Sequence, residues 1–461
     1  MKFVNVVKGM IGLEIHAYPI TKEKLFCRCA ARRGKGLKAN SYICPICTGQ
    51  PGAKPELANK AAVEKAVLIG LMLGCSIEKD WKWQRKHYDW PDMPKGFQNT
   101  ISGGLSKSVG KNGKFHGIKI RSMHLEEDPA AWNPETGEID YNRSGLPLVE
   151  IITDPDFKDA ESVMGWLKKL IANLGYLKSI DKDAGIKVDV NVSIPGKSER
   201  TEIKNINSIE NIGKAIEYEL KRQGKEGGKE KETRRFDAGK GKTEVMRQKE
   251  GQDDYRFITD PDLQDVKITE KFISEIEKKL PETPEEKLKK LVKKYKIGKG
   301  DADVLAKNID VVEFFEAVMG ETRVKKEKVL SWVTGELLRH LNYNKTSLDG
   351  LDIKVEHFVS LLELVDSGKI TEQQGKKILD KFIPKSFDPK KEIKGKGKIS
   401  GEGELGKVVE KVIGKNGKAV EDYGAGEEKA LHFLIGQVMR ETAGRADTEI
   451  VRKLLKKKLK D

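Results

Sequence analysis

Carboxylates and histidines gather in three short segments of a strongly basic chain, residues 11–16, 124–128 and 150–154. The chain has 461 residues, with 87 lysines and arginines against 72 acidic residues, so its formal net charge is +15. Mg²⁺ prefers carboxylate oxygens and often acts on the phosphates of a substrate. Acidic segments within a basic protein therefore indicate metal-assisted phosphate chemistry on a polyanionic substrate.

The first of these segments alternates apolar and polar residues in the manner of a β-strand. Ile11, Leu13 and Ile15 share one face, which places Glu14 and His16 side by side on the other. The oxygen and nitrogen atoms of such a pair can bind a cation. A hydrogen-bonded pair at the edge of the core is the alternative interpretation.

The other two segments add carboxylates. Glu126, Glu127 and Asp128 follow one another, and Glu150 ends the apolar run 146–149. Alone, residues 126–128 would be a solvated turn. Together with Glu150 they indicate a cation site, because carboxylates at close range repel one another unless a cation neutralises them.

Four of the five cysteines form two short pairs, Cys27-x-Cys29 and Cys44-x-x-Cys47. In a cytosolic chain, paired cysteines at this spacing are typical of a tetrahedral zinc site and not of disulfides. Such a site would close residues 27–47 into a zinc knuckle. The alternative is a set of reduced cysteines with a redox or packing role.

Basic and aromatic residues are interleaved in the segment 81–95, which includes Trp81, Trp83, Lys86 and Lys95. Aromatic rings can stack on an adenine or on the terminal base of a tRNA, while lysine and arginine bind phosphates. A packed aromatic strand edge is the alternative interpretation of the same residues.

Composition and missing motifs exclude several classes of protein. The chain has no apolar run of about 20 residues and no signal-peptide core, so we expect a cytoplasmic protein without a membrane span. Phe236 stands where a P-loop ending at Gly241-Lys242-Thr243 would need glycine, and no Gly-x-Ser-x-Gly elbow is present. No motif in the sequence indicates a serine or cysteine nucleophile. An isoelectric point near 9.2 favours a nucleic-acid partner.

The periodicity of the chain predicts an α+β fold, with short strands and helices up to about residue 268 and helices beyond the boundary at Pro281 and Pro284. The individual expectations are helices over 56–75 (with Cys75 as a core thiol), 161–175, 209–223, 285–383 and 408–461, a strand over 187–194, a loop or hairpin over 224–243, and a flexible basic linker over 384–407.

Several longer motifs together resemble one known family. In chain order they are 11–16 (Ile-Gly-Leu-Glu-Ile-His), the four paired cysteines, 85–88 (Arg-Lys-His-Tyr), 124–128 (His-Leu-Glu-Glu-Asp), 142–150 (Asn-Arg-Ser-Gly-Leu-Pro-Leu-Val-Glu), 202–208, 253–257, 260–263 and 433–439. On these motifs the chain is similar to the B subunits of aspartyl/glutamyl-tRNA amidotransferases over nearly its whole length. The related subunit of the enzyme for Glu-tRNA alone shares the N-terminal motifs. It also carries a large inserted domain, for which this chain has no room.

The resemblance implies a two-step reaction. With ATP and Mg²⁺, the side-chain carboxylate of Asp-tRNA(Asn), Glu-tRNA(Gln) or both is phosphorylated, and ammonia then displaces the phosphate to give the amide. The ammonia comes from glutamine hydrolysed in a separate amidase (glutaminase) subunit, and a small third subunit completes the complex. Mischarged tRNA is the expected nucleic-acid partner, and neither DNA nor a membrane is expected as a partner.

The resemblance also implies roles for individual residues. Its Mg²⁺ ligands and catalytic groups are Glu14, His16, Glu127 and Glu150, and its cofactor-binding lysines are Lys86 and Lys95, for phosphate or channel roles, and Lys204. Zinc on Cys27, Cys29, Cys44 and Cys47 is structural, because some members of the family lack these cysteines. One departure is residues 128–131, Asp-Pro-Ala-Ala, where the family usually continues with a Glu-Asp-Ala-Gly-like sequence.

Three parts follow from this interpretation. Residues 1–284 form a mixed-sheet, cradle-like catalytic domain with the zinc knuckle, residues 285–400 a helical domain with the basic linker, and residues 401–461 a small helical tail that binds tRNA. The competing hypothesis is a non-catalytic, zinc-containing tRNA-binding scaffold whose chemistry lies in a partner protein.

Overall fold

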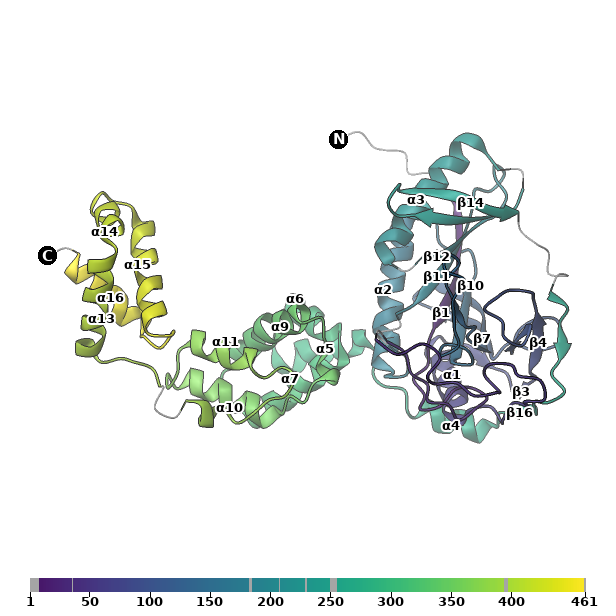
Figure 1. Ribbon diagram of the computed structural model, residues 1–461, viewed down its shortest axis with the longest axis horizontal. Helices are drawn as coiled ribbons and strands as arrows, with labels where there is room; N and C mark the ends of the chain where they lie inside the picture. The colour runs from purple at the N-terminus through teal and green to yellow at the C-terminus, as the bar shows by residue number, and fades with distance from the viewer. Residues whose placement is uncertain are drawn as a thin grey trace. The chain divides into compact units, whose positions relative to one another are not determined.

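The computed structural model describes residues 8–34, 36–181, 185–206, 208–228, 230–248, 255–393 and 397–459, with the side chains of residues 205, 247 and 248 outside that description. The chain divides into two units, Met1–Thr283 and Pro284–Asp461. Mixed strands and helices in the first unit and helices in the second confirm the predicted α+β class (Figure 1).

A 12-stranded sheet organises the first unit. Its main path is β14 (Lys242–Gln248), β13 (Glu232–Asp237), β12 (Thr201–Ile206), β11 (Lys187–Ser193), β1 (Met10–Ala17), β10 (Pro147–Thr153), β7 (Ile118–Glu127), β5 (Phe97–Thr100), β4 (Gln84–His87) and β15 (Ile258–Thr259). β6 (Gly110–Phe115) joins β7, and β2 (Ser76–Ile77) joins β6. The β12–β13 pair is parallel, whereas the other pairs along this path are antiparallel.

Helices cover one face of this sheet and make it the buried face. Ile11, Leu13 and Ile15 of β1 are at most 1% exposed and belong to the same core as the inward residues of α1 (Lys60–Met72), α2 (Ala160–Tyr176) and α3 (Ile209–Glu226). Figure 1 shows α2 and α3 alongside the strands β1, β11 and β12. Because strand residues alternate between faces, the polar residues of β1 and its neighbours lie on the opposite side.

Local signals fix the ends of these helices. The side chain of Asp159 accepts a hydrogen bond from the Ser162 amide at the start of α2, and Ser208 does the same for the Asn211 amide at the start of α3. Such caps satisfy amide groups that have no partner within a helix. α3 ends at Glu226, and the next residue, Gly227, caps it with a φ of 70°, which favours glycine.

The smaller elements of the first unit frame the sheet. They are the two-stranded pairs β3 (Asp80–Trp81) with β16 (Val266–Lys267) and β8 (Ala131–Trp132) with β9 (Ile139–Asp140), and the helix α4 (Glu270–Glu277). In the large sheet, β1 and β11 confirm the strands predicted at the N-terminus and over 187–194. The helices α1, α2 and α3 confirm the three helices predicted within this unit, and Cys75 is buried as expected. The 224–243 segment begins the β13–β14 hairpin, which is one of the two expected forms.

The second unit is helical and has two hydrophobic clusters. One unites α5 (Pro284–Tyr295), α6 (Lys299–Ala306), α7 (Ile309–Glu321), α8 (Lys326–Ser331), α9 (Leu338–Tyr343), α10 (Val355–Asp366) and α11 (Glu372–Asp380), with a π-helical turn at Trp332–Leu337 between α8 and α9. The other unites α13 (Glu402–Lys415), α14 (Gly417–Gly424), α15 (Glu428–Glu441) and α16 (Thr448–Lys458).

The segment predicted as a flexible linker contains ordered elements. Asp388 caps the short helix α12 (Pro389–Glu392), whose first residue is a proline, and α13 already begins at Glu402. Residues 394–396 lie outside the described residues. Among the helices that the structure describes, none is long and apolar enough to cross a membrane.

Candidate functional site

Strand pairing brings acidic and histidine residues from four strands to the polar face of the sheet. On β1, Glu14 pairs with Asp189 of β11, and His16 pairs with Glu150 of β10. On the next strand, β7, His124 is the partner of Glu150. Directly paired residues of an antiparallel sheet point to the same face, so segments more than 100 residues apart in sequence meet in one row.

Three of the four predicted Mg²⁺ ligands form a tight group. The Nε2 atom of His16 lies 3.6 Å from a carboxylate oxygen of Glu14 and 3.6 Å from one of Glu150. One ligand atom from each of the three residues lies within 4.8 Å of the others. Their side chains keep between 13% and 27% of their surface exposed, so a ligand can reach them.

The charges of this group are strongly coupled. Burial alone would lower the pKa of His16, but the close carboxylates of Glu14 and Glu150 outweigh burial and raise it to about 10. Burial and the nearby charges of Glu126 and Glu14 raise the pKa of Glu150 to about 8. Burial opposes ionisation of Glu14 as well, but the contacts with His16 hold its pKa below the usual range. The group therefore holds protons that a divalent cation would displace.

Glu127, the fourth predicted ligand, lies outside this group of three. Its carboxylate pairs with the ammonium of Lys95 and accepts a hydrogen bond from the Asn99 amide at 2.8 Å. Successive strand residues point in opposite directions. The neighbouring Glu126 accordingly has other partners, Gln98 and Thr100.

The three predicted cofactor-binding lysines all lie beside carboxylates. Lys204 is 3.1 Å from Asp189 and 3.2 Å from Glu202, and these charges raise its pKa although burial opposes them. Burial opposes the charge of Lys86 too, but Glu126 and Glu150 raise its pKa. The ammonium of Lys86 also lies 4.8 Å from the centre of the Tyr255 ring. Lys86 and Lys204 therefore bring positive charge to the acidic row, whereas Lys95 neutralises Glu127.

The aromatic segment divides between the two interpretations of its sequence. Trp81 and Trp83 are at most 1% exposed, and Trp83 packs edge-to-face on Phe26 with ring centres 4.8 Å apart. These two rings are core residues and cannot stack on a base. Trp90, at 50% exposed, packs edge-to-face against Trp132 and keeps an open surface.

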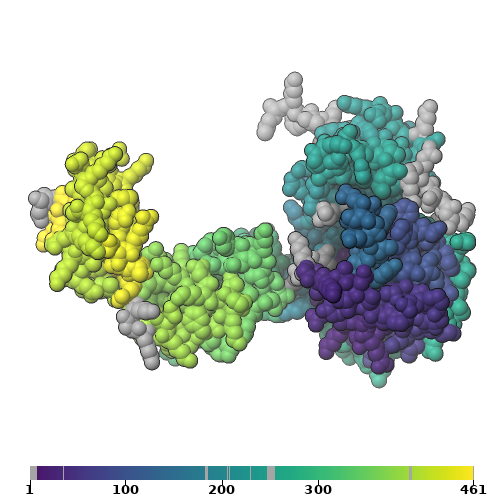
Figure 2. Space-filling view, in the orientation of Figure 1, coloured from purple at the N-terminus to yellow at the C-terminus, as the bar shows by residue number. Residues whose placement is uncertain are grey.

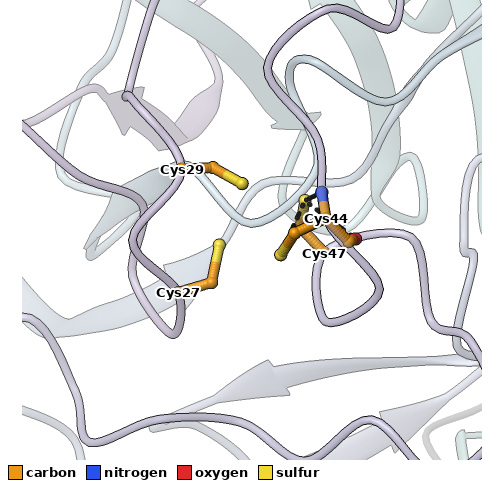
Figure 3. A group of neighbouring side chains, drawn as sticks. All are labelled: Cys27, Cys29, Cys44 and Cys47. Atoms are coloured by element: carbon orange, nitrogen blue, oxygen red, sulfur yellow. Dashed lines mark hydrogen bonds between the residues drawn. The ribbon is translucent and has the colours of Figure 1, made fainter.

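The four paired cysteines come together as the spacing predicts. All five cysteines of the chain are free, and one sulfur atom from each of Cys27, Cys29, Cys44 and Cys47 lies within 4.8 Å of the other three. Figure 3 shows the sulfurs of Cys27 and Cys29 pointing toward the turn that carries Cys44 and Cys47. The purple N-terminal segment, which includes this loop, forms part of the surface of the first unit (Figure 2).

The chemistry of these sulfurs fits a thiophilic metal such as zinc. The neighbouring Cys27 thiol lowers the pKa of Cys47 to about 4, while Cys47 in turn raises the pKa of Cys27. The Cys44 amide and the charge of Lys24 also lower the pKa of Cys47, and burial opposes them. The Cys44 amide donates to Cys47 Sγ at 3.2 Å. Thiolate is the form of cysteine that binds metal.

Three neighbours of these sites were not among the predicted site residues. Asp189 carried a signal, because the alternation of the 187–194 segment places it on the polar face of its strand. Glu126 was visible as one of three adjacent acidic residues, but sequence alone did not distinguish it from Glu127. Lys24 carried only a weak signal, a lysine directly before an apolar pair and the first cysteine.

Family models and curated relatives match this chain over most of its length. The model of the GatB/GatE catalytic domain matches residues 9–274, and the model of the GatB domain matches residues 313–459. Curated relatives include the B subunit of the aspartyl/glutamyl-tRNA(Asn/Gln) amidotransferase of Methanocaldococcus jannaschii, which is 44% identical over 98% of both chains. The B subunit of Methanococcus aeolicus is 40% identical to this chain over 98% of this chain and 99% of the relative. That of Methanopyrus kandleri is 40% identical over 97% of this chain and 98% of the relative.

These matches cover both units and include the strands that carry Glu14, His16 and Glu150. They confirm the resemblance that the sequence motifs indicated. The chain belongs to the family of tRNA amidotransferase B subunits.

Proposed function

We propose that the polar face of the sheet phosphorylates the side-chain carboxylate of Asp-tRNA(Asn), Glu-tRNA(Gln) or both, and then converts it to the amide. The observation that carries this proposal is the group of Glu14, His16 and Glu150, whose ligand atoms lie within 4.8 Å of one another. Lys86 and Lys204 add positive charge close to this group. Carboxylate and imidazole ligands beside lysines are suited to a metal-bound nucleotide phosphate.

The two steps balance without a nucleophile from the protein. An oxygen of the substrate carboxylate forms a bond to the γ-phosphorus of ATP, and ADP leaves. Ammonia then forms a bond to the carbonyl carbon, phosphate leaves, and ammonia loses a proton. When bound, Mg²⁺ supplies positive charge to the transferring phosphoryl group. Lys86 and Lys204 are placed to orient the phosphates and to stabilise negative charge on them.

Glu127 has a separate place in this proposal. Its carboxylate is paired with the ammonium of Lys95. We propose that Glu127 joins the metal site once Lys95 leaves it to bind phosphate or another anion.

The cysteine group has a structural role in this proposal. Zinc on Cys27, Cys29, Cys44 and Cys47 would hold the two turns of the knuckle together. It would thus close the loop and take no part in the reaction. The loop contacts the segment before β10 directly: Ser144 Oγ donates to the carbonyl of Cys47 at 2.7 Å. Zinc would therefore support the catalytic sheet from one end.

As a member of the B-subunit family, the chain works with partner subunits and a tRNA substrate. The specific partners in this proposal are an amidase (glutaminase) subunit, which releases ammonia from glutamine, and a small third subunit, in the cytoplasm. Within the chain, residues 1–284 would carry the chemistry, residues 285–400 would connect the parts, and residues 401–461 would bind tRNA. The GatB/GatE catalytic-domain match over residues 9–274 does not favour a purely structural scaffold.

The decisive experiment is amidation of each mischarged tRNA by the reconstituted complex, together with ATP hydrolysis in its presence. We expect ATP hydrolysis that depends on mischarged tRNA and is lost when this chain carries Glu150→Gln. Hydrolysis that persists unchanged with that variant would place the phosphorylation chemistry in one of the partner proteins.

A further inference from the structure

Lys24 is a buried lysine whose ammonium group lies beside the cysteine group. Lys24 is 1% exposed, and such deep burial is rare for a lysine. The ammonium donates to the sulfur of Cys47 at 3.4 Å and to the carbonyl oxygen of Tyr141 at 3.0 Å. Within the part of the chain that the structure describes, no aspartate or glutamate pairs with it. A buried ammonium is costly unless negative charge compensates it, so among the described residues the cysteine group is the source of that compensation.

The charge of a loaded cysteine site would match this lysine. Four thiolates around one Zn²⁺ leave a formal charge of about −2. Such a charge in a largely buried place needs positive or hydrogen-bonding neighbours, which commonly come from the residues behind the ligands. The Cys44 amide is one such donor, and the ammonium of Lys24 is another donor to the same sulfur.

The second hydrogen bond of Lys24 ties the cysteine site to the turn before β10. Tyr141 begins the segment 141–145, whose Ser144 contacts the Cys47 carbonyl and whose Gly145 carbonyl accepts from the Leu25 amide at 2.8 Å. β10 starts two residues after this segment and carries Glu150. The ammonium therefore lies between the metal-binding sulfurs and the turn that precedes the acidic row.

We propose that Lys24 is a positioning residue of the cysteine metal site: it compensates the charge of the metal-bound thiolates and fastens the loaded site to the Tyr141 turn. This inference rests on the proposed occupancy of the cysteines by zinc. It predicts that metal affinity, and not only stability, depends on the positive charge at position 24.

The test compares Lys24→Met, Lys24→Gln and Lys24→Arg in the full chain, with Lys22→Met as the matched control. Lys22 is an exposed lysine two residues away. Competition of Zn²⁺ against a chromophoric chelator should show affinity at least about tenfold weaker for the Met and Gln variants, the usual effect of removing such a neighbour of a metal ligand. The Arg variant should lose less, and Lys22→Met should match the unaltered chain. Equal affinity in all four variants would overturn the proposal.

Cobalt substitution provides a second measurement that a loss of packing alone would not move. A hydrogen bond to a thiolate stabilises its lone pairs. Lys24→Met removes the donor to Cys47 Sγ, because a thioether has no N–H or O–H group, and should therefore shift the sulfur-to-cobalt charge-transfer band to lower energy. An unshifted band would count against the contact. If Lys24→Met does not fold, the comparison of the Gln and Arg variants still decides, and equal affinity of those two would overturn the role of charge. An unaltered chain that binds no zinc would instead refute the zinc site itself.

Discussion

Glu150 of β10 lies directly opposite His16 of β1, and their side chains approach to 3.6 Å. The sequence separates these residues by more than 130 positions, but the antiparallel register of the two strands fixes their distance. A shift of that register by one residue would move every side chain of a strand to the other face. The buried apolar faces of both strands therefore also hold the acidic group in place.

Replacing Glu150 by glutamine should lower phosphorylation of mischarged tRNA by at least about a hundredfold, the scale typical of losing a main electrostatic group in a reaction centre. Glutamine preserves the shape of the side chain but removes a charge from the proposed metal site. The comparison uses the reconstituted complex at saturating ATP, and the glutaminase activity of the partner should survive uncoupled from amidation. Glu135→Gln, at an exposed turn, is the control and should be without effect.

The same assay separates metal binding from general damage. Raising the Mg²⁺ concentration should partly restore phosphorylation by the Glu14→Gln variant, because the remaining ligands still form a weaker metal site. Full activity of both Glu14→Gln and Glu150→Gln at limiting Mg²⁺ would show that these residues are not metal ligands.

The candidate site shows where sequence reasoning succeeds and where it stops. Alternation along one strand predicted that Glu14 and His16 share a face, because a period of two is a local property. The partnership of Glu14 with Asp189 depends on the register between strands, which only the folded chain sets. Glu127 illustrates the same limit: the motif shows adjacent acidic residues, but it does not show that Lys95 neutralises one of them. The cysteine group was predictable because its pairing follows from short spacing, whereas Lys24 depends on how that loop packs.

The Lys95–Glu127 pair should behave as a coupled unit in stability. Both side chains are largely buried, with 17% and 6% of their surface exposed. Lys95→Met alone leaves a buried carboxylate without its cation, which is expected to cost more than removing both charges. The double variant Lys95→Met/Glu127→Gln should therefore melt at a higher temperature than Lys95→Met alone. Thermal unfolding of the full chain measures this, and equal melting temperatures of the two variants would mean that the pair is not coupled.

Metal analysis should find about one zinc per chain in the purified protein. Cys47→Ser should abolish that zinc and lower the melting temperature of the first unit, because closure of the knuckle depends on the metal. Cys75→Ser is the matched control: Cys75 is also buried and free, but it lies outside the cysteine group. A Cys47→Ser protein that retains zinc and full thermal stability would exclude the predicted site.

The basic residues of the C-terminal helices are expected to bind tRNA. Lys453, Lys456 and Lys457 of α16 are exposed, and so is Lys429 of α15. Phosphate contacts give an affinity that falls with salt concentration, and each lost contact lowers the slope of that dependence by about one. A solvated helix face is the alternative, since exposed lysines are common on helices.

Two variants of the tail distinguish these interpretations. The triple change Lys453→Gln/Lys456→Gln/Lys457→Gln leaves the hydrophobic cluster of α13–α16 intact. Deletion of residues 402–461 cuts the chain where α13 begins and so removes all four helices. Both should weaken tRNA binding and raise the KM for mischarged tRNA. Amidation at saturating tRNA should change much less, because the proposed metal ligands lie in the first unit. Binding titrations at two salt concentrations measure the slope. If both variants bind tRNA as tightly as the unaltered chain and with the same salt slope, the lysines of α16 are a solvated face and the tail does not contact the RNA.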